Sequence, residues 1–216
     1  MSFQGWPEAA LDFFEGLELD NSKAYWTANR TVYDQAVLAP MTQLTEELAA
    51  EFGDVKIFRP YRDIRFSADK SPYRTEIGAT VGSAYIRLSA AGLAAGNGMF
   101  HLAPDQLSRF RDGVGDDVSG GQLERLVAAM DAHGITLIGH EVLKSAPRGY
   151  PADHPRIGLL KHKGLAAYKE WPVEAWLATA AARDHVKEFL AMTRPLIEWL
   201  DVHVGPSALE SAGRRR

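Results

Sequence analysis

The chain has 216 residues, of which 46% are hydrophobic and 24% charged, with a formal net charge of −4. This composition is that of an ordinary soluble globular protein and excludes a disordered chain, and the length predicts a single domain over residues 1–216. With no cysteine, disulfides and cysteine-based zinc sites are excluded. No apolar run reaches the roughly 18 residues of a membrane span, and the acidic N-terminal segment has no signal-peptide pattern. We therefore predict a cytoplasmic protein without a membrane partner.

The first quarter of the chain is predicted to be helical. A first helix covers residues 7–17 and begins at Pro7, and a second covers 23–38 with Asn21 or Ser22 as its N-cap. A third helix begins or is kinked at Pro40 and ends at Gly53. Because residues 1–54 contain two basic and ten acidic side chains, this part is expected to be acidic.

Strands are predicted mainly in the middle of the chain. A strand over 55–59 is placed at a sheet edge by Pro60, residues 77–90 form one long strand, and residues 92–102 form its hairpin partner. A helix begins at Pro104, and Ser119 is the predicted N-cap of another. The remaining predicted elements are a strand at 135–143, a short helix at 155–162, a strand at 165–171 and a helix at 183–201. Strands that gather without strict βα alternation indicate an α+β fold, with a central, mainly antiparallel sheet flanked by N-terminal and C-terminal helices.

The familiar catalytic and metal motifs are missing from this sequence. His140-Glu141 begins like HExxH, but Lys144 replaces the second histidine, and we predict no metal site. The segment 67–70 matches S-x-x-K but lacks the accompanying SDN and KTG elements, and Pro72 disfavours the helix that this chemistry needs. The sequence identifies no cofactor and leaves open whether the protein is an enzyme.

Residues 58–75 concentrate positive charge in an otherwise acidic chain. They contain five basic side chains against Asp63 and Asp69, with aromatic residues between them and a turn at Ser71-Pro72. Arginine and lysine suit phosphate or carboxylate groups, provided that a turn at Asp63-Ile64 brings Arg62 and Arg65 together. The predicted ligand-binding residues here are Tyr61, Arg62, Arg65, Lys70, Ser71, Tyr73 and Arg74.

A second basic segment, residues 144–163, contains five basic side chains against Asp153 alone. It adds Arg148 and Lys161 to the predicted site, which would then be a cationic pocket for a phosphate-bearing or carboxylate-bearing small molecule. If there is catalysis, the acid–base candidates are Asp63, Asp69 and His154.

Three other interpretations remain open from the residues alone. The two aspartates could form a purely structural salt-bridge network with the arginines. The basic and aromatic residues could instead bind nucleic acid, although the net charge disfavours this. The loop could also meet an acidic protein partner.

The motif RDIRFSADKSPYRT resembles the RDxRFSxDKSPYKT signature of a family of bacterial and fungal conserved hypothetical proteins, a domain of unknown function. Asn21-Ser22-Lys23-Ala24-Tyr25-Trp26 with Asn29 is similar to the family's N-terminal element, and the hairpin Gly96-Asn97-Gly98-Met99 is similar to its glycine-rich strand. The segment from Lys144 to Tyr150, with His154-Pro155 and Leu160-Lys161, resembles its second basic segment. Arg74 and Arg148 stand where the family commonly has lysine. The resemblance implies no activity or cofactor, but it suggests that segments 58–75 and 144–163 meet in one place.

Overall fold

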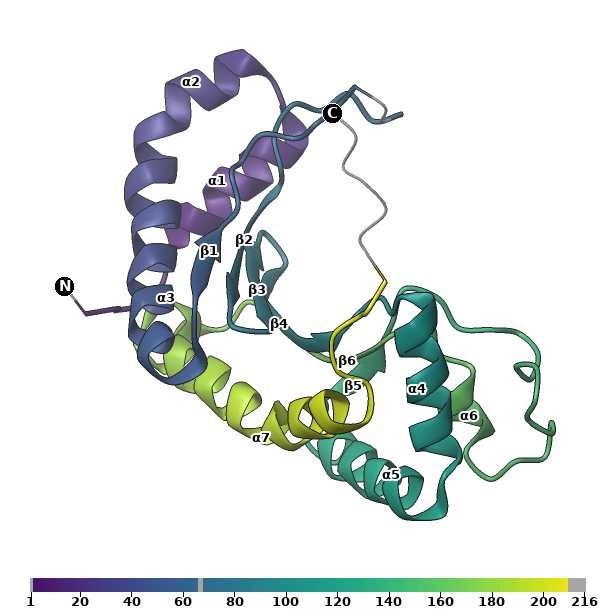
Figure 1. Ribbon diagram of the computed structural model, residues 1–216. Coiled ribbons are helices and arrows are strands. Elements are labelled where there is room, and N and C mark those ends of the chain that lie inside the picture. The colour runs from purple at the N-terminus through teal and green to yellow at the C-terminus, as the bar shows by residue number, and fades with distance from the viewer. Residues whose placement is uncertain (1, 66–67, 210–216) are drawn as a thin grey trace. The chain divides into compact units, whose positions relative to one another are not determined.

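The computed structural model describes residues 2–65 and 68–209 (Figure 1). It divides into two compact units, which are described separately below. Unit one contains Met1–Ala95 and Glu170–Phe189, and unit two contains Gly96–Lys169 and Leu190–Arg216. The single domain expected from the sequence stays a prediction.

Helices form both ends of the chain, and its middle contains the strands together with three further helices. The helices are α1 (Glu8–Leu19), α2 (Lys23–Val32), α3 (Ala39–Phe52), α4 (Pro104–Gly115), α5 (Asp117–Asp131), α6 (Ile157–Leu160) and α7 (Ala181–His203), with a π-helical segment at Tyr33–Leu38 and a 3-10 turn at Ala175–Ala178. The strands are β1 (Val55–Ile57), β2 (Glu76–Val81), β3 (Ala84–Ser89), β4 (Gly92–Met99), β5 (Thr136–Ile138) and β6 (Leu165–Trp171). Within the described residues, no helix is both long and apolar enough to cross a membrane.

The six strands form an antiparallel sheet in the order β1-β2-β3-β4-β6-β5. Strands β1 to β3 belong to unit one and β5 to unit two, while β4 and β6 each contain a point where the chain passes from one unit to the other. The α+β fold with a central antiparallel sheet is therefore confirmed.

The core of unit one lies between its helices and one face of its strands. Helix α3 packs on β1 and β2 (Figure 1). Alternate residues of the β2–β3 hairpin face this core, and Ile77, Val81, Ile86 and Leu88 are at most 2% exposed. This period-two burial is what one buried face of a sheet requires.

The long strand predicted over residues 77–90 is wrong, because the chain reverses in its middle. Val81 pairs with Ala84, so Gly82 and Ser83 form a two-residue hairpin loop between β2 and β3. Gly82 has a φ of 57°, which glycine adopts without the steric cost that other residues meet. A positive φ at the first loop residue only is the pattern of a type II′ hairpin turn.

Unit two is built on helices α4 and α5 and the second half of α7. The predicted N-cap of α5 at Ser119 is wrong: the cap is Asp116, whose carboxylate accepts hydrogen bonds from the backbone N–H groups of Val118 and Ser119. Ser119 is buried, its hydroxyl donates to the Gly113 carbonyl at 2.6 Å, and its own carbonyl accepts from the Trp199 indole at 2.9 Å. Asp116 captures the helix start because it satisfies two N–H groups that have no partner within the helix.

The hairpin turn gives a first prediction. A Cβ at Gly82 would lie 2.1 Å from the Phe52 carbonyl oxygen, whereas a Cβ at Gly134, also at positive φ (68°), would meet nothing within 4 Å. We expect Gly134→Ala to lower the free energy of unfolding by about 1 kcal/mol, the cost of the backbone conformation, and Gly82→Ala to lower it at least twice as much. Urea denaturation of both variants measures this, and equal losses would show that the Phe52 carbonyl moves aside without cost.

Candidate functional site

The segment between β1 and β2 folds into a two-stranded arm, defined here as residues 58–75. Tyr61 and Tyr73 form an antiparallel β-bridge. It is flanked by two backbone hydrogen bonds, from Arg62 N–H to the Pro72 carbonyl (2.9 Å) and from Arg74 N–H to the Pro60 carbonyl (2.8 Å). Phe66 and Ser67 lie outside the described residues.

The pairing sorts the side chains of the arm onto two faces. Residues directly opposite each other in such a bridge point to the same face, and their neighbours along each strand point to the other. Tyr61 and Tyr73 therefore share one face, and Arg62 and Arg74 share the opposite face as diagonal neighbours about 7–8 Å apart at Cα. The pair of arginines that the ladder places on one face is Arg62 with Arg74.

Stacking on helix α2 holds the tyrosine face of the arm. The Tyr73 ring lies parallel to the Trp26 ring, with centroids 4.5 Å apart and an interplanar angle of 8°. Trp26 and Tyr73 are 4% and 5% exposed, whereas Tyr61, whose ring centroid is 5.9 Å from that of Trp26, is 45% exposed. Of the two predicted ligand-binding tyrosines, Tyr61 is open to solvent and Tyr73 anchors the arm.

The Asn21 side chain fixes the same point through hydrogen bonds. Its amide oxygen accepts from the Tyr73 N–H at 3.0 Å, and its amide nitrogen donates to the Tyr73 carbonyl at 3.2 Å. Ser22 is the N-cap of α2 and accepts from the Tyr25 N–H. Capping preferences predicted Asn21 as an alternative N-cap of α2, whereas its side chain binds the backbone of Tyr73. The signal that could have found this contact is the family-like element in which Asn21 stands.

Two ion pairs shape the tip of the arm. Arg62 pairs with Asp69, and Arg65 pairs with Asp63 at 2.6 Å. Hydrogen bonds from the Arg65 side chain and backbone lower the pKa of Asp63 to about 2. Those from the Ser71 hydroxyl and N–H and from Arg62 lower the pKa of Asp69 to about 2. Carboxyl groups with such a pKa stay ionised at neutral pH, which suits charge pairing better than proton transfer.

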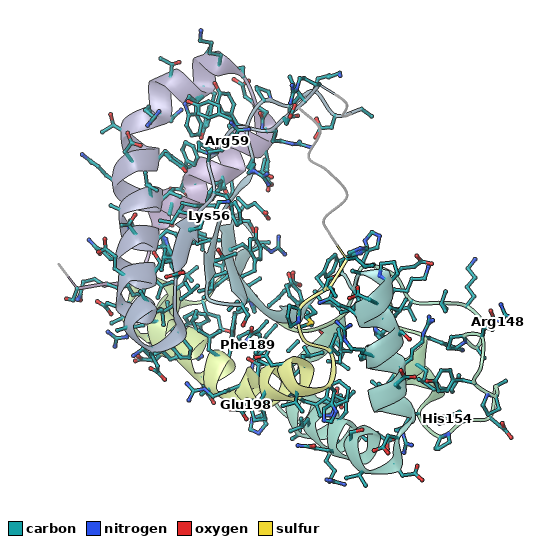
Figure 2. The ribbon with its side chains drawn as sticks, viewed as in Figure 1. Lys56, Arg59, Arg148, His154, Phe189 and Glu198 are labelled. Atoms are coloured by element: carbon teal, nitrogen blue, oxygen red, sulfur yellow. The ribbon has the colours of Figure 1, made fainter. Side chains whose placement is uncertain are left out.

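Three cations of the arm have no carboxylate partner among the described residues. Lys70 donates to the Ile64 carbonyl at 3.1 Å, and Arg59 and Arg74 are exposed without an ion pair. Figure 2 labels Arg59 where the chain leaves β1 for the arm. Because both aspartates are occupied by Arg62 and Arg65, the positive charge of these three side chains faces solvent.

In the second basic segment, which belongs to unit two, some of the cations have structural partners. Arg156 is 7% exposed and donates to the carbonyls of Val114 (2.7 Å) and Gly115 (3.1 Å), so it caps the C-terminal end of α4, and it pairs with Asp117 at 2.8 Å. Lys163 pairs with Glu141 at 2.8 Å. These two cations of the segment therefore have structural partners.

The predicted residues of this segment lie on and after its loop. Arg148 is exposed, and Figure 2 shows it with His154 on the loop between β5 and α6. Lys161 is half-buried at the C-cap of α6. The His154 Nδ1 accepts from the Arg156 N–H at 3.1 Å, and its ring packs edge-on against Tyr150. This segment belongs to unit two and the arm to unit one, so their union in one site stays a prediction.

Comparison with known proteins gives one match. Residues 9–199 match the model of a family described as conserved hypothetical protein (DUF2461), which covers most of the chain. No curated protein and no solved structure matches the chain. Within the described residues, no group of three or more histidine, aspartate or glutamate side chains is arranged to hold a metal ion.

The Asn21 contact predicts how firmly the arm is held. Loss of two hydrogen bonds, worth about 1–2 kcal/mol together, should raise the rate of tryptic cleavage within the arm about 5- to 30-fold in Asn21→Ala. Asn29→Ala is the matched control, because the Asn29 amide donates to the Tyr25 carbonyl one turn earlier in the same helix and forms no hydrogen bond with the described residues of the arm. Mass spectrometry of timed digests gives the rates, and equal rates in the two variants would mean that the tyrosine stack alone holds the arm.

The Arg65–Asp63 pair predicts a specific titration. In Arg65→Gln the pKa of Asp63 should rise from about 2 towards 3.8, because the side-chain hydrogen bond that lowers it most is lost. The pKa of Asp69 should stay near 2, since Ser71 is its main hydrogen-bond donor. A depressed pKa means that the ionised carboxylate stabilises the folded arm above pH 4 and that this contribution is lost between pH 4 and 2. Side-chain carboxyl ¹³C NMR measures both values, and an unchanged Asp63 would contradict the pairing.

Proposed function

The chain belongs to the family of conserved hypothetical proteins DUF2461, and since that description names no activity, we propose from the arm itself that the protein binds a phosphate- or carboxylate-bearing small molecule. The proposal concerns binding and includes no chemical step. Its setting is the cytoplasm, a reducing compartment with which a cysteine-free chain is compatible.

The observation that carries the proposal is the unequal use of charge in the arm. Five cations meet two carboxylates, and both carboxylates are engaged, which leaves Arg59, Lys70 and Arg74 for an external anion. A salt-bridge network alone would explain Arg62 and Arg65 but not the other three. An oxyanion ligand supplies the acceptors that these donors need.

The anchoring of the arm supports the same function. A ligand that binds to a mobile loop loses affinity to the entropy of ordering that loop. Here the base of the arm is already fixed by the Asn21 hydrogen bonds and the Trp26 stack. Arg62 uses one of its terminal nitrogens for Asp69, and its guanidinium carries further N–H donors on the face that it shares with Arg74.

A second candidate is single-stranded nucleic acid, which the exposed ring of Tyr61 favours. Bases stack on exposed aromatic rings next to basic residues, and Tyr61 is 45% exposed on the arm. Salt separates the two candidates, because contacts with many phosphates weaken steeply as salt rises, whereas a single anion site weakens less. An acidic protein partner for the arm remains the third alternative.

Thermal unfolding with candidate ligands tests the proposal. The panel contains pyrophosphate, sugar phosphates, nucleotides, dicarboxylates and a short oligonucleotide, each at two salt concentrations. A ligand at 100 times its dissociation constant should add about 2.7 kcal/mol to the free energy of unfolding. Arg74→Gln should weaken binding of that ligand about 10- to 100-fold, as expected for a charged hydrogen bond.

Arg125→Gln is the matched control, since Arg125 is an exposed arginine on α5, outside both basic segments. It should leave binding unchanged. Equal weakening in the two variants would show a diffuse charge effect. A stabilising ligand that binds Arg74→Gln as tightly as the unmodified protein would exclude the arm as its site.

A further inference from the structure

A groove in unit one lies between helix α1 and the segment 173–178 that follows β6. Its volume is about 420 Å³. Trp6 and Leu177 form an apolar floor and are 1% and 2% exposed, and Val173 is 49% exposed at the side. The Trp6 indole N–H is buried and has no acceptor among the described residues. A ligand side chain that covers Val173 beside this floor would remove apolar surface from water.

The rim of this groove is acidic on both sides. Glu8, Asp12 and Glu15 follow one another at spacings of four and three residues, so they share one face of α1, and Glu174 lies on the other side. No basic residue lines the groove, and none of the four carboxylates forms an ion pair within the described parts of the chain. Glu174 accepts a hydrogen bond from the Trp176 indole at 2.9 Å.

The apolar floor and the acidic rim together determine which class of ligand fits the groove. The carboxylates repel anionic ligands and anionic membrane surfaces, and they attract cations. They are not grouped as metal ligands among the described residues. A bare cation has no hydrophobic group to lie on the apolar floor. A ligand that fits both features has a hydrophobic side chain between its positive charges.

We propose that this groove docks a cationic amphipathic segment of a partner protein. An apolar side chain of that segment lies on the floor beside Val173, and flanking lysine or arginine residues pair with the rim carboxylates. The proposal is independent of the arm and of its anionic ligand.

Fluorescence anisotropy with two labelled peptides tests this inference. One peptide has three leucines and four lysines, and the other has serine in place of each leucine and the same charge. The leucine peptide should bind at least about tenfold more tightly, because seating one leucine contributes that factor. Its affinity should fall about three- to tenfold in Val173→Asn, which keeps the charge of the groove.

Matched variants separate docking from general attraction. Val118→Asn changes another exposed valine, at the start of α5, and should leave affinity unchanged. The pair Asp12→Asn with Glu15→Gln should weaken binding about fivefold at low salt, and Glu188→Gln with Glu198→Gln, which removes two exposed carboxylates of α7, should not.

Three results would overturn the proposal. Equal binding of the two peptides would mean adsorption by charge alone. Equal weakening by the groove variants and their controls would place the peptide elsewhere. A dimer, detected by sedimentation and disrupted by Val173→Asn, would make a second copy of the chain the occupant.

Discussion

The arm depends on the place where its second strand meets the start of helix α2. The Asn21 amide bonds both backbone groups of Tyr73, and the Trp26 ring covers the Tyr73 ring. Without these contacts, five basic side chains would extend on an 18-residue segment between β1 and β2, and any ligand would have to order that segment itself. Because Ser22 caps α2 directly beside Asn21, the helix start and the arm are fixed at one point. The N-terminal helices therefore position the candidate site as well as cover the sheet.

The ion pairs of the arm have a different role from this anchor. The Arg65 side chain is 76% exposed and that of Asp63 is 47% exposed, and pairs this open to water add little to stability. Their effect is electrostatic. Each arginine balances the negative charge of one aspartate, and the lowered pKa keeps both carboxylates ionised at every pH above about 4. The remaining cations are exposed and form no ion pair among the described residues, which leaves them available to an external anion.

The sequence predicted the features that local chemistry decides. Proline at or directly before the first helical residue and glycine after the last one predicted the start of α1 and α4 and the end of α3, and the lack of strict βα alternation predicted an antiparallel sheet. The prediction of one long strand overlooked a change of phase at Gly82 and Ser83, because the buried side chains are odd-numbered from Ile77 to Val81 and even-numbered from Ala84 to Leu88. The Gly-Ser pair was the signal, since it favours a two-residue hairpin loop.

Residues whose role depends on distant partners could not be read in the same way. Arg156 counted as one of five cations in segment 144–163, yet it is buried and caps α4 through carbonyls some 40 positions earlier in the chain. Asn21 is 52 positions from Tyr73, and nothing local indicates their contact. The sequence supplies the side chains of the candidate site, but which cations face solvent is decided by tertiary pairing.

Unit one carries two surfaces of opposite charge. The net charge of −4 gives no sign that this unit carries a cationic arm on the β1–β2 connection and an acidic, apolar-floored groove on α1. Under the two proposals, the arm binds an anion and the groove binds a cationic segment. Part of the negative charge in the acidic first quarter of the sequence therefore lies around a groove with an apolar floor. A partner that fits this groove needs a hydrophobic side chain as well as positive charge.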